Sequence, residues 1–514
     1  MLNPIKLVLA DPGFCTRVGL MQVRYALWVN LTEVSVGMAY GFAAVSLPYI
    51  ASPEDIMKVT MHEGNWIATV LSMVAPIGCL MMGLVMDRYG RRPAMLLCKV
   101  PLCIGWLYTG FAPSSIHVIV GVVITGMGCG MAISPPRVYI AEASLPNMRG
   151  TLSAFTPLAS SIGIAIQACL AWLFPWKIVC FITAFYTAGL IVLDYFLPET
   201  PYFLLTQTDT SVEVEQTLKR LRGDEYDMQQ ELEEIIDFKT TNKISKMTIY
   251  GTLQAILTLS AWKPFGIIAG YMFIEQISGA SIMIVWTVEI LAGSRSTVNP
   301  NVGNAMMSAT RFCTAIVLTG LLYKLSRRFL ALTSSVGVGV ACFQIFLFLE
   351  FSAKRHVFPQ ICYIFYVLFA TLGYNSLPFM YMSELFPLQV RGLMGGVSLT
   401  FWSLVTFGVI KLYPVICALI GLQYILLIFS VSSLLGCLFV AVFLPETKNL
   451  TLPEIEEYFK GFRATLVSQR QVMASQLFEA SRNSSMIRQT SKTSANKPEK
   501  GKSIFNVPLN ISGQ

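Results

Sequence analysis

The feature that most constrains the fold of this chain is a series of long apolar runs. Each is about 20 residues long and carries little charge, and a helix of about 20 apolar residues crosses the hydrocarbon core of a bilayer. The runs lie near 28–50, 65–86, 94–112, 116–138, 152–174 and 176–197, and again near 264–290, 302–323, 328–350, 359–383, 393–419 and 422–444. The sequence therefore predicts an all-α membrane protein with twelve transmembrane helices in two six-helix halves.

The composition agrees with this fold class and argues against a soluble enzyme. Hydrophobic residues make up 54% of the 514 residues and charged residues only 13%. Lipid, rather than water, solvates a chain of this kind. Three histidines and scattered cysteines offer no metal or redox spacing, and no nucleophile motif or phosphate loop is present. We therefore expect no catalysis and no cofactor.

Basic residues fix the expected orientation. They gather in alternate loops, which the positive-inside rule assigns to the cytoplasm, together with both termini. Lys354, Arg355 and His356 would then face outward, and they count mildly against this orientation. The supporting residues are Arg88, Arg91 and Arg92 after the second run, Arg149 after the fourth, Lys324, Arg327 and Arg328 after the eighth, and Arg391 after the tenth.

The segments outside the runs complete the predicted organisation. The linker contains the charged, helix-compatible text VEVEQTLKRLRGDEYDMQQELEEIIDF, which predicts short amphipathic helices. After about residue 468, polar residues accumulate and apolar periodicity fades, which predicts a largely disordered end. The predicted parts are a cytoplasmic N-terminus (1–27), an N-terminal half (28–197), a cytoplasmic linker (198–262), a C-terminal half (263–444) and a cytoplasmic tail (445–514).

An internal repeat relates the two halves. Pro136, Tyr139, Glu142, Arg149 and Gly150 recur with identical spacing as Pro378, Tyr381, Glu384, Arg391 and Gly392. PETP at 198–201 returns as PETK at 445–448, and GLVMDRYGRRP from Gly83 returns in eroded form from Gly320. Two homologous six-helix halves are suited to alternating access, in which the halves rock about a site near the membrane midplane.

The repeated charges predict a lock at the cytoplasmic face. Acidic and basic side chains at helix ends can pair between the halves when the inner side is closed and separate when it opens. The alternative is that they serve only orientation and solubility in short loops. The predicted gating residues are Asp87, Arg88, Arg91, Arg92, Glu142, Arg149, Glu199, Glu384, Arg391 and Glu446.

At these residues the sequence resembles the sugar porter family of the major facilitator superfamily, and most of all its insect facilitated trehalose transporter-like branch. The resemblance covers about residues 28–460 and implies a central cavity for a hexose or a disaccharide. The matching motifs are GxxxDRxGRR from Gly83, PxxYxxExxxxxxRG from Pro136, PESPR from Pro198 with Tyr202 in place of its arginine, SELFPLQVRG from Ser383 and PETKN from Pro445.

The resemblance also implies a substrate site, and several positions depart from the family pattern. The family's QQxSGxN begins here at Glu275, so an acid replaces its first amide and Ser281 replaces its asparagine. Arg311 stands where the eighth span usually has an amide, Phe379 replaces a tryptophan, and Val122 and Pro157 replace an arginine and a glutamine. The implied substrate-binding residues are Glu275, Gln276, Ser281, Arg311, Phe379 and Trp402, and Trp286 matches an outer-gate tyrosine.

Glu275 and Arg311 allow more than one interpretation, because ionisable groups inside a span are costly and mark functional sites by default. They could form a structural ion pair between neighbouring spans. Alternatively, Arg311 binds an anionic or strongly polar substrate while Glu275 sets selectivity or titrates. A neutral Glu275 or a different register is the remaining alternative.

Proton coupling has a weaker basis. The family's proton-driven members have an aspartate in the first span, and the matching step here, Gly41-Phe42-Ala43, has no carboxylate. Glu33 lies earlier in that span, where we expect it near the cytoplasmic mouth, and Glu275 is the better candidate for any coupling.

The leading function is facilitated diffusion of a sugar across the plasma membrane. The alternatives are a carrier of another polar solute or organic anion that uses Arg311, and a sugar receptor that moves little solute and signals through its tail. We expect a small-molecule substrate and the lipid bilayer as partners and no nucleic acid, and the sequence leaves the oligomeric state open.

Overall fold

In the computed structural model, the described residues are 14, 16–50, 60–207, 211–223, 232, 259–352, 354–387, 390–448, 450 and 452–461. They belong to one compact unit, Pro12–Leu466, and everything below refers to it. The predicted disorder after residue 468, the extreme N-terminus and most of the linker after residue 223 lie outside the described residues.

The N-terminal half has the six expected spans, and its fifth span consists of two consecutive helices. Thr60 and Glu63 form a capping box at the start of the second span, where Thr60 N donates to Glu63 Oε2 (2.9 Å). The spans are α2 (Arg17–Ile50), α3 (Met61–Tyr89), α4 (Arg91–Gly110), α5 (Ser115–Ala143), α6 (Pro146–Ser153) with α7 (Phe155–Leu173), and α8 (Trp176–Asp194).

The C-terminal half also has six spans, and two of them are broken. In the sequence, the linker between the halves forms the helices α9 (Pro201–Gln207) and α10 (Ser211–Arg222), as predicted for short helices in this segment. The helix α22 (Leu452–Phe459) follows the last span. The spans are α13 (Leu259–Ile277) with α14 (Ile282–Val285) and α15 (Thr287–Gly293), α16 (Pro300–Lys324), α17 (Arg327–Phe351), α18 (Phe358–Leu372) with α19 (Leu377–Leu385), α20 (Arg391–Ile420), and α21 (Leu422–Phe443).

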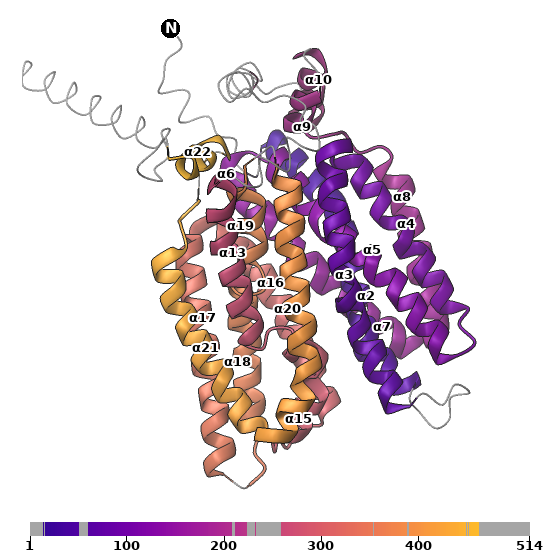
Figure 1. Ribbon diagram of the computed structural model, residues 1–514, viewed down its shortest axis with the longest axis vertical. Helices are drawn as coiled ribbons and strands as arrows, with labels where there is room; N and C mark the ends of the chain where they lie inside the picture. The colour runs from indigo at the N-terminus through magenta and orange to yellow at the C-terminus, as the bar shows by residue number, and fades with distance from the viewer. Residues whose placement is uncertain are drawn as a thin grey trace, which may run out of the picture. The chain divides into compact units, whose positions relative to one another are not determined.

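The prediction of twelve spans agrees with these elements. Ten helices of the described part are long and apolar enough to cross a membrane. The helix α2 and the broken unit α13 to α15 occupy the first and seventh positions. Figure 1 shows the two halves side by side, with α9, α10 and α22 at the same end, which we call the linker end.

The helices differ from the apolar runs in two respects. The first helix begins at Arg17 rather than near residue 28, because Tyr25 and Ala26 are buried in a cluster with Met95, Tyr139 and Leu221 that extends the packed face of α2. The seventh and tenth spans are not continuous helices. Gly279 has a positive φ of 89° in the first break, a conformation that glycine adopts at little cost. The second break spans residues 373–376.

Small residues bring the helices of the N-terminal half into close contact. A Cβ added at Gly126 would lie 2.9 Å from Leu71 O, and one added at Gly130 would lie 2.1 Å from Ala75 O. Both neighbours are on α3, so α5 and α3 approach at backbone distance. Membrane helices pack closely by this means because lipid supplies no hydrophobic force between them.

A second close contact joins the halves along α3 and α20. Gly83 and Gly396 face the backbone of the opposite helix, and a Cβ at Gly396 would lie 2.7 Å from Cys79 O. Further along, Thr400 Oγ1 donates to Pro76 O (3.2 Å). The backbones of α3 and α20 therefore approach closely at the interface between the halves, with few side-chain atoms between them.

We expect Gly130→Ala to lower the free energy of unfolding by about 1–3 kcal/mol, because the new methyl group has no space against the α3 backbone. Thermal unfolding in detergent measures this change. The matched control is Gly189→Ala in α8, where nothing lies within 4 Å of an added Cβ. Equal unfolding temperatures for the two variants would contradict the close packing of α3 and α5.

Candidate functional site

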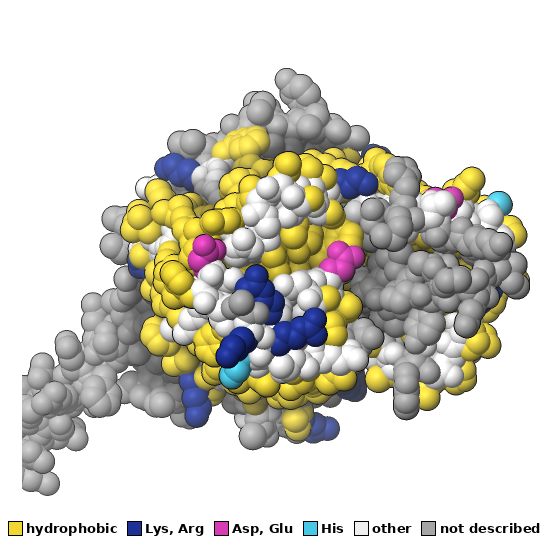
Figure 2. Space-filling model, turned by 90° about the horizontal axis from the view of Figure 1, so that it is seen from below, with side chains coloured by type: hydrophobic (Ala, Val, Ile, Leu, Met, Phe, Trp, Pro, Cys, Tyr) yellow, Lys and Arg dark blue, Asp and Glu magenta, His cyan; other side chains and the backbone are white. Residues whose placement is uncertain are grey.

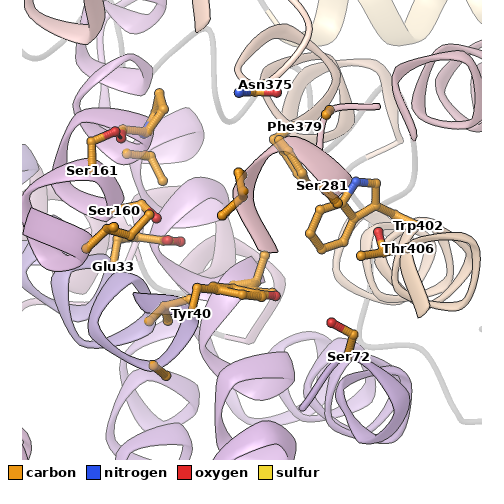
Figure 3. A pocket seen from close by; sticks show the side chains of 18 of the residues that line it. Glu33, Tyr40, Ser72, Ser160, Ser161, Ser281, Asn375, Phe379, Trp402 and Thr406 are labelled. Carbon is orange, nitrogen blue, oxygen red and sulfur yellow. Dashed lines mark hydrogen bonds between the residues drawn. The ribbon is translucent and has the colours of Figure 1, made fainter. Parts of the chain in front are cut away.

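A cavity of about 180 Å³ lies between the two halves. This is far more than the roughly 15 Å³ that one ordered water needs. Its wall comes from α2, α3, α5, α6 and α7 on one side and from α13, α14, α16, α18, α19, α20 and the two helix breaks on the other. Figure 3 shows Glu33, Tyr40 and Ser160 of the first half across the space from Trp402 and Thr406 of the second. A solute in this cavity therefore touches both halves.

Most of the polar side chains in the cavity wall are uncharged, and several of their atoms have no partner. A buried polar atom without a hydrogen bond costs about 1–3 kcal/mol, so such atoms favour a solute that completes their bonding. They are contributed by both halves. Among the described residues they are Ser153 Oγ, Thr156 Oγ1, Glu275 Oε2, Arg311 Nε, Trp402 Nε1 and Thr406 Oγ1.

Most of the predicted substrate-binding residues lie in this wall, together with the family departures Val122 and Pro157. Gln276 does not lie in the wall, because adjacent residues of a helix point in different directions and Glu275 takes the cavity side. The side-chain atoms Nε2 and Oε1 of Gln276 are buried without a hydrogen-bond partner. The predicted residues that line the cavity are Glu275, Ser281, Arg311, Phe379 and Trp402.

Glu275 and Arg311 do not form an ion pair in this conformation. Oε2 of Glu275 and Nε of Arg311 are buried without a hydrogen-bond partner. Trp402 and Gln276 lie near the Glu275 carboxyl, whereas Tyr366 lies near Arg311. The interpretation as a structural pair therefore has no contact to support it here, and both side chains are accessible to a solute.

Trp286 lies outside the cavity wall and contacts its own half. Its Nε1 donates to Ile410 O (3.3 Å), and its ring centroid is 6.0 Å from that of Tyr413, both on α20. The role of Trp286 in an outer gate remains a prediction.

A cluster in the cavity wall was missed by the sequence analysis. Arg137 Nη1 donates to Glu33 Oε1 (2.6 Å), and the Arg137 guanidinium carbon lies 4.9 Å from the centroid of the Phe379 ring. The Phe379 ring in turn meets Trp402 edge to face at 5.2 Å. Glu33 therefore lines the cavity as one member of a buried pair, and its expected place near the cytoplasmic mouth remains a prediction. The signal in the sequence was an arginine inside an apolar span.

At the linker end, Glu142 contacts both halves. Its Oε1 accepts from Arg91 Nη2 (2.7 Å) in its own half and from Arg391 Nη1 (3.4 Å) in the other. Its Oε2 accepts from Thr200 Oγ1 (2.7 Å). Arg149 also reaches the other half, since its Nη1 donates to Leu450 O (3.3 Å).

Asp87 makes a different kind of contact between the halves. Its two carboxylate oxygens accept from the backbone N–H groups of Gly392 (3.1 Å) and Leu393 (2.8 Å). These are the first residues of α20, where the free N–H groups and the helix dipole favour a carboxylate. Asp87 therefore caps a helix of the opposite half.

Glu199 and Glu446, predicted as gating residues, cap helices of their own halves. Glu199 accepts from the N–H groups of Arg91 and Arg92 (both 3.0 Å) at the start of α4. Glu446 accepts from the N–H groups of Arg327 (3.3 Å) and Arg328 (3.1 Å) at the start of α17. Burial raises the pKa of Glu199, and the Thr200 N–H and the α4 donors oppose that rise. In each half, the glutamate of the repeated Pro-Glu-Thr segment therefore caps the start of a helix of that half.

The remaining predicted gating residues also stay within their halves. Glu384 pairs with Arg327, as Glu142 pairs with Arg91. Arg92 donates to Tyr195 O, and the exposed Arg88 lies over the ring of Tyr89. Among the described residues, the ion pair that crosses the halves in this lock is Glu142 with Arg391.

Comparison with known proteins places this architecture in a family. The profile of the family described as sugar (and other) transporter matches residues 36–459. The chain belongs to the sugar (and other) transporter family. Facilitated trehalose transporter Tret1 of Apis mellifera ligustica is 27% identical over 454 residues, which cover 86% of this chain and 88% of that protein. Tret1-1 of Drosophila sechellia is 26% identical, and this chain spans about half (52%) of its length.

Solved structures share the fold of this transporter. The major facilitator superfamily proton:xylose symporter XylE bound to 6-bromo-6-deoxy-D-glucose superposes with a TM-score of 0.71 at 18% identity, over 85% of this chain and 99% of that one. The inward open conformation of XylE from E. coli gives 0.63 at 17% identity, over 84% and 98%. The predicted major facilitator fold is confirmed.

This transporter family performs no covalent chemistry on its solute. Within the described part of the chain, no three His, Cys, Asp or Glu side chains are placed to hold a metal ion. The cavity wall offers hydrogen-bonding and aromatic groups to a solute.

We expect Glu142→Gln to loosen the linker end of this transporter, because the neutral side chain loses its charge interaction with Arg391 across the halves. Hydrogen exchange of the Gly392 and Leu393 amides, measured by mass spectrometry in nanodiscs, should rise severalfold. Glu384→Gln is the matched control, since Glu384 pairs within its own half. An equal rise in both variants would show that the repeated glutamates are equivalent.

Proposed function

We propose that this protein carries a sugar across a membrane by alternating access, without coupling to an ion. The observation that carries the proposal is the cavity between the halves, whose wall offers unpartnered hydroxyl, indole and charged groups from both sides. A sugar leaving water needs donors and acceptors to replace its hydration, because unpaired polar groups are costly in an apolar site. The facilitated trehalose transporters named above support a sugar as the solute.

The aromatic pair in the cavity supports the same solute class. Phe379 and Trp402 meet edge to face, and both line the cavity. A pyranose ring has an apolar face that can lie against an aromatic ring while its hydroxyl groups bond elsewhere. The indole N–H of Trp402 lies near the Glu275 carboxyl in the cavity wall and can donate to a hydroxyl group of a solute there.

The contacts at the linker end favour a moving transporter over a static receptor. Few side chains bridge the halves there, and each half keeps its own caps and ion pairs. Rigid halves joined by a small number of replaceable contacts suit a rocking motion.

We further propose that the protein lies in the plasma membrane and that its linker end faces the cytoplasm. This places Arg88, Arg92 and Arg328 on the cytoplasmic side, in agreement with the positive-inside rule. Figure 2 shows the opposite end, where a group of Lys and Arg side chains lies beside a histidine. Arg295 Nη1 donates to Ser352 O (2.7 Å) there, close to the charged residues 354–356. These cations at the outward end count mildly against the proposed orientation.

Facilitated diffusion is the proposed mode because the first span lacks the aspartate of proton-driven relatives. Two carboxylates nevertheless line the cavity. Glu33 is neutralised by Arg137, whereas Glu275 has no cation in contact. Glu275 is therefore the residue to examine if uptake responds to a proton gradient.

An uptake panel in proteoliposomes tests the proposal. We expect labelled glucose or trehalose to equilibrate without any ion gradient and to show counterflow. Trp402→Ala should weaken apparent affinity about 3- to 10-fold through loss of its ring contact. Trp262→Ala is the control, because Trp262 is exposed on α13 and does not line the cavity. Sugar binding without flux would instead identify a receptor.

A second candidate function is transport of a sugar or polyol that carries a carboxylate. The unpartnered Arg311 in the wall is the observation that favours it. Arginine matches the geometry of a carboxylate with two parallel hydrogen bonds.

Charge substitutions separate the two candidates. Arg311→Gln should lower affinity for the true solute by about 10- to 150-fold, the equivalent of one charged hydrogen bond. Glucose and glucuronate are compared in the same vesicles, with Glu275→Gln as the second variant and the exposed Lys354→Gln as control. A loss confined to glucuronate supports the carboxylate carrier. Unchanged selectivity and pH dependence in both cavity variants would remove Glu275 and Arg311 from the site.

A further inference from the structure

The cluster of Glu33, Arg137 and Phe379 joins the halves inside the cavity rather than at its end. Arg137 is fixed by its own half, since its guanidinium donates to Glu33 on α2 and to Ile133 O one turn earlier on α5. The Glu33 side chain is 1% exposed and that of Arg137 12%, so the pair is shielded from water. Contacts within the N-terminal half therefore fix the direction of the Arg137 guanidinium plane, without help from the other half.

The partner of Arg137 in the other half lies on a short helix that follows a break. Phe379 lies in the first turn of α19, a nine-residue helix that follows the break at 373–376. The other end of α19 is anchored, because Glu384 pairs with Arg327. α19 packs against α5 across the halves, and the guanidinium carbon of Arg137 lies 4.9 Å from the Phe379 ring centroid.

We propose that Glu33, Arg137 and Phe379 form a latch that holds α19 against α5 while the linker end is closed, with Glu33 and Arg137 as positioning residues. This inference rests on the alternating access proposed above. Opening the linker end separates α5 from α19, so the contact of Arg137 with Phe379 must break in every cycle.

The energetics suit a reversible latch. When the halves separate, Arg137 keeps its bond to Glu33, because both residues belong to the same half. No bare charge is left, and the loss is limited to one cation–π contact, which corresponds to a change of about 2- to 30-fold in the open–closed equilibrium. An ion pair across the halves would instead leave a costly unpaired charge.

The Phe379 ring belongs both to the latch and to the wall of the solute cavity. Phe379, Trp402 and Arg137 all line the cavity, and the two rings are in contact. A solute that lies against the ring pair shifts Phe379 relative to Arg137, and occupancy thereby changes the ease of opening at the linker end.

A double-mutant cycle tests the latch, with hydrogen exchange of residues 391–396 in solute-free nanodiscs as the readout. Phe379→Leu removes the ring and leaves the pair of Glu33 and Arg137 intact. Arg137→Lys keeps a positive charge for Glu33 but loses the planar guanidinium. We expect each single variant to raise exchange in this segment about 2- to 30-fold, the double variant to exceed Phe379→Leu by little, and Phe379→Tyr to restore slow exchange.

Two results would overturn the latch. Fully additive effects in the double variant would show that the two side chains act separately. A rise in exchange spread evenly over α2, α5 and α8 would show general loosening of the N-terminal half. Because the readout contains no solute, its outcome is independent of the uptake panel, and a failure of sugar transport is recognised separately.

Discussion

Every ionisable group in the spans of this protein must find a partner or an aqueous space, because hydrocarbon offers neither hydrogen bonds nor counter-ions. This constraint sorts the charges into three places. Acids and arginines at the linker end cap helices and pair with each other. Lys99 and Asp194 pair inside the N-terminal half, where Trp28 Nε1 also donates to Asp194 (3.1 Å). A third group lines the cavity, and within it Glu275 and Arg311 lack the ion pair that Glu33 and Arg137 form.

The repeat explains the architecture of each half but not the junction between them. Glu199 and Glu446 cap the starts of α4 and α17 in the same way, and the Arg91 pair with Glu142 has its counterpart in Arg327 with Glu384. The symmetry ends where the halves meet. Glu142 also receives Arg391, whereas Glu384 has no described contact of this kind with Arg149, whose guanidinium donates to Ala141 O and Leu450 O. Of the two repeated glutamates, only Glu142 has a described ion pair with an arginine of the other half.

The sequence predicted the spans and the repeat, because apolar length and motif spacing are local properties, and five of its six predicted substrate-binding residues line the cavity. It did not predict the breaks in the seventh and tenth spans, where Gly279 and the residues at 373–376 interrupt the helices within otherwise apolar runs. It also placed Gln276 in the site, although the helix turns that side chain away when Glu275 faces the cavity. Arg137 was missed because its partners, Glu33 and Phe379, are distant in sequence and meet through packing of three helices.

The contacts within each half are stronger than those between the halves, and this difference is what a transport cycle requires. Glu142 lies 2.7 Å from Arg91 but 3.4 Å from Arg391, so separation leaves its shorter ion pair and its bond from Thr200 intact. Arg391 retains Phe386 O, Arg149 retains Ala141 O, and Arg137 retains Glu33. Asp87 is the exception, since the backbone donors it accepts belong to the opposite half. Opening therefore breaks a small number of weak contacts and removes the backbone donors of one carboxylate, Asp87, whose renewed capping of α20 favours closure.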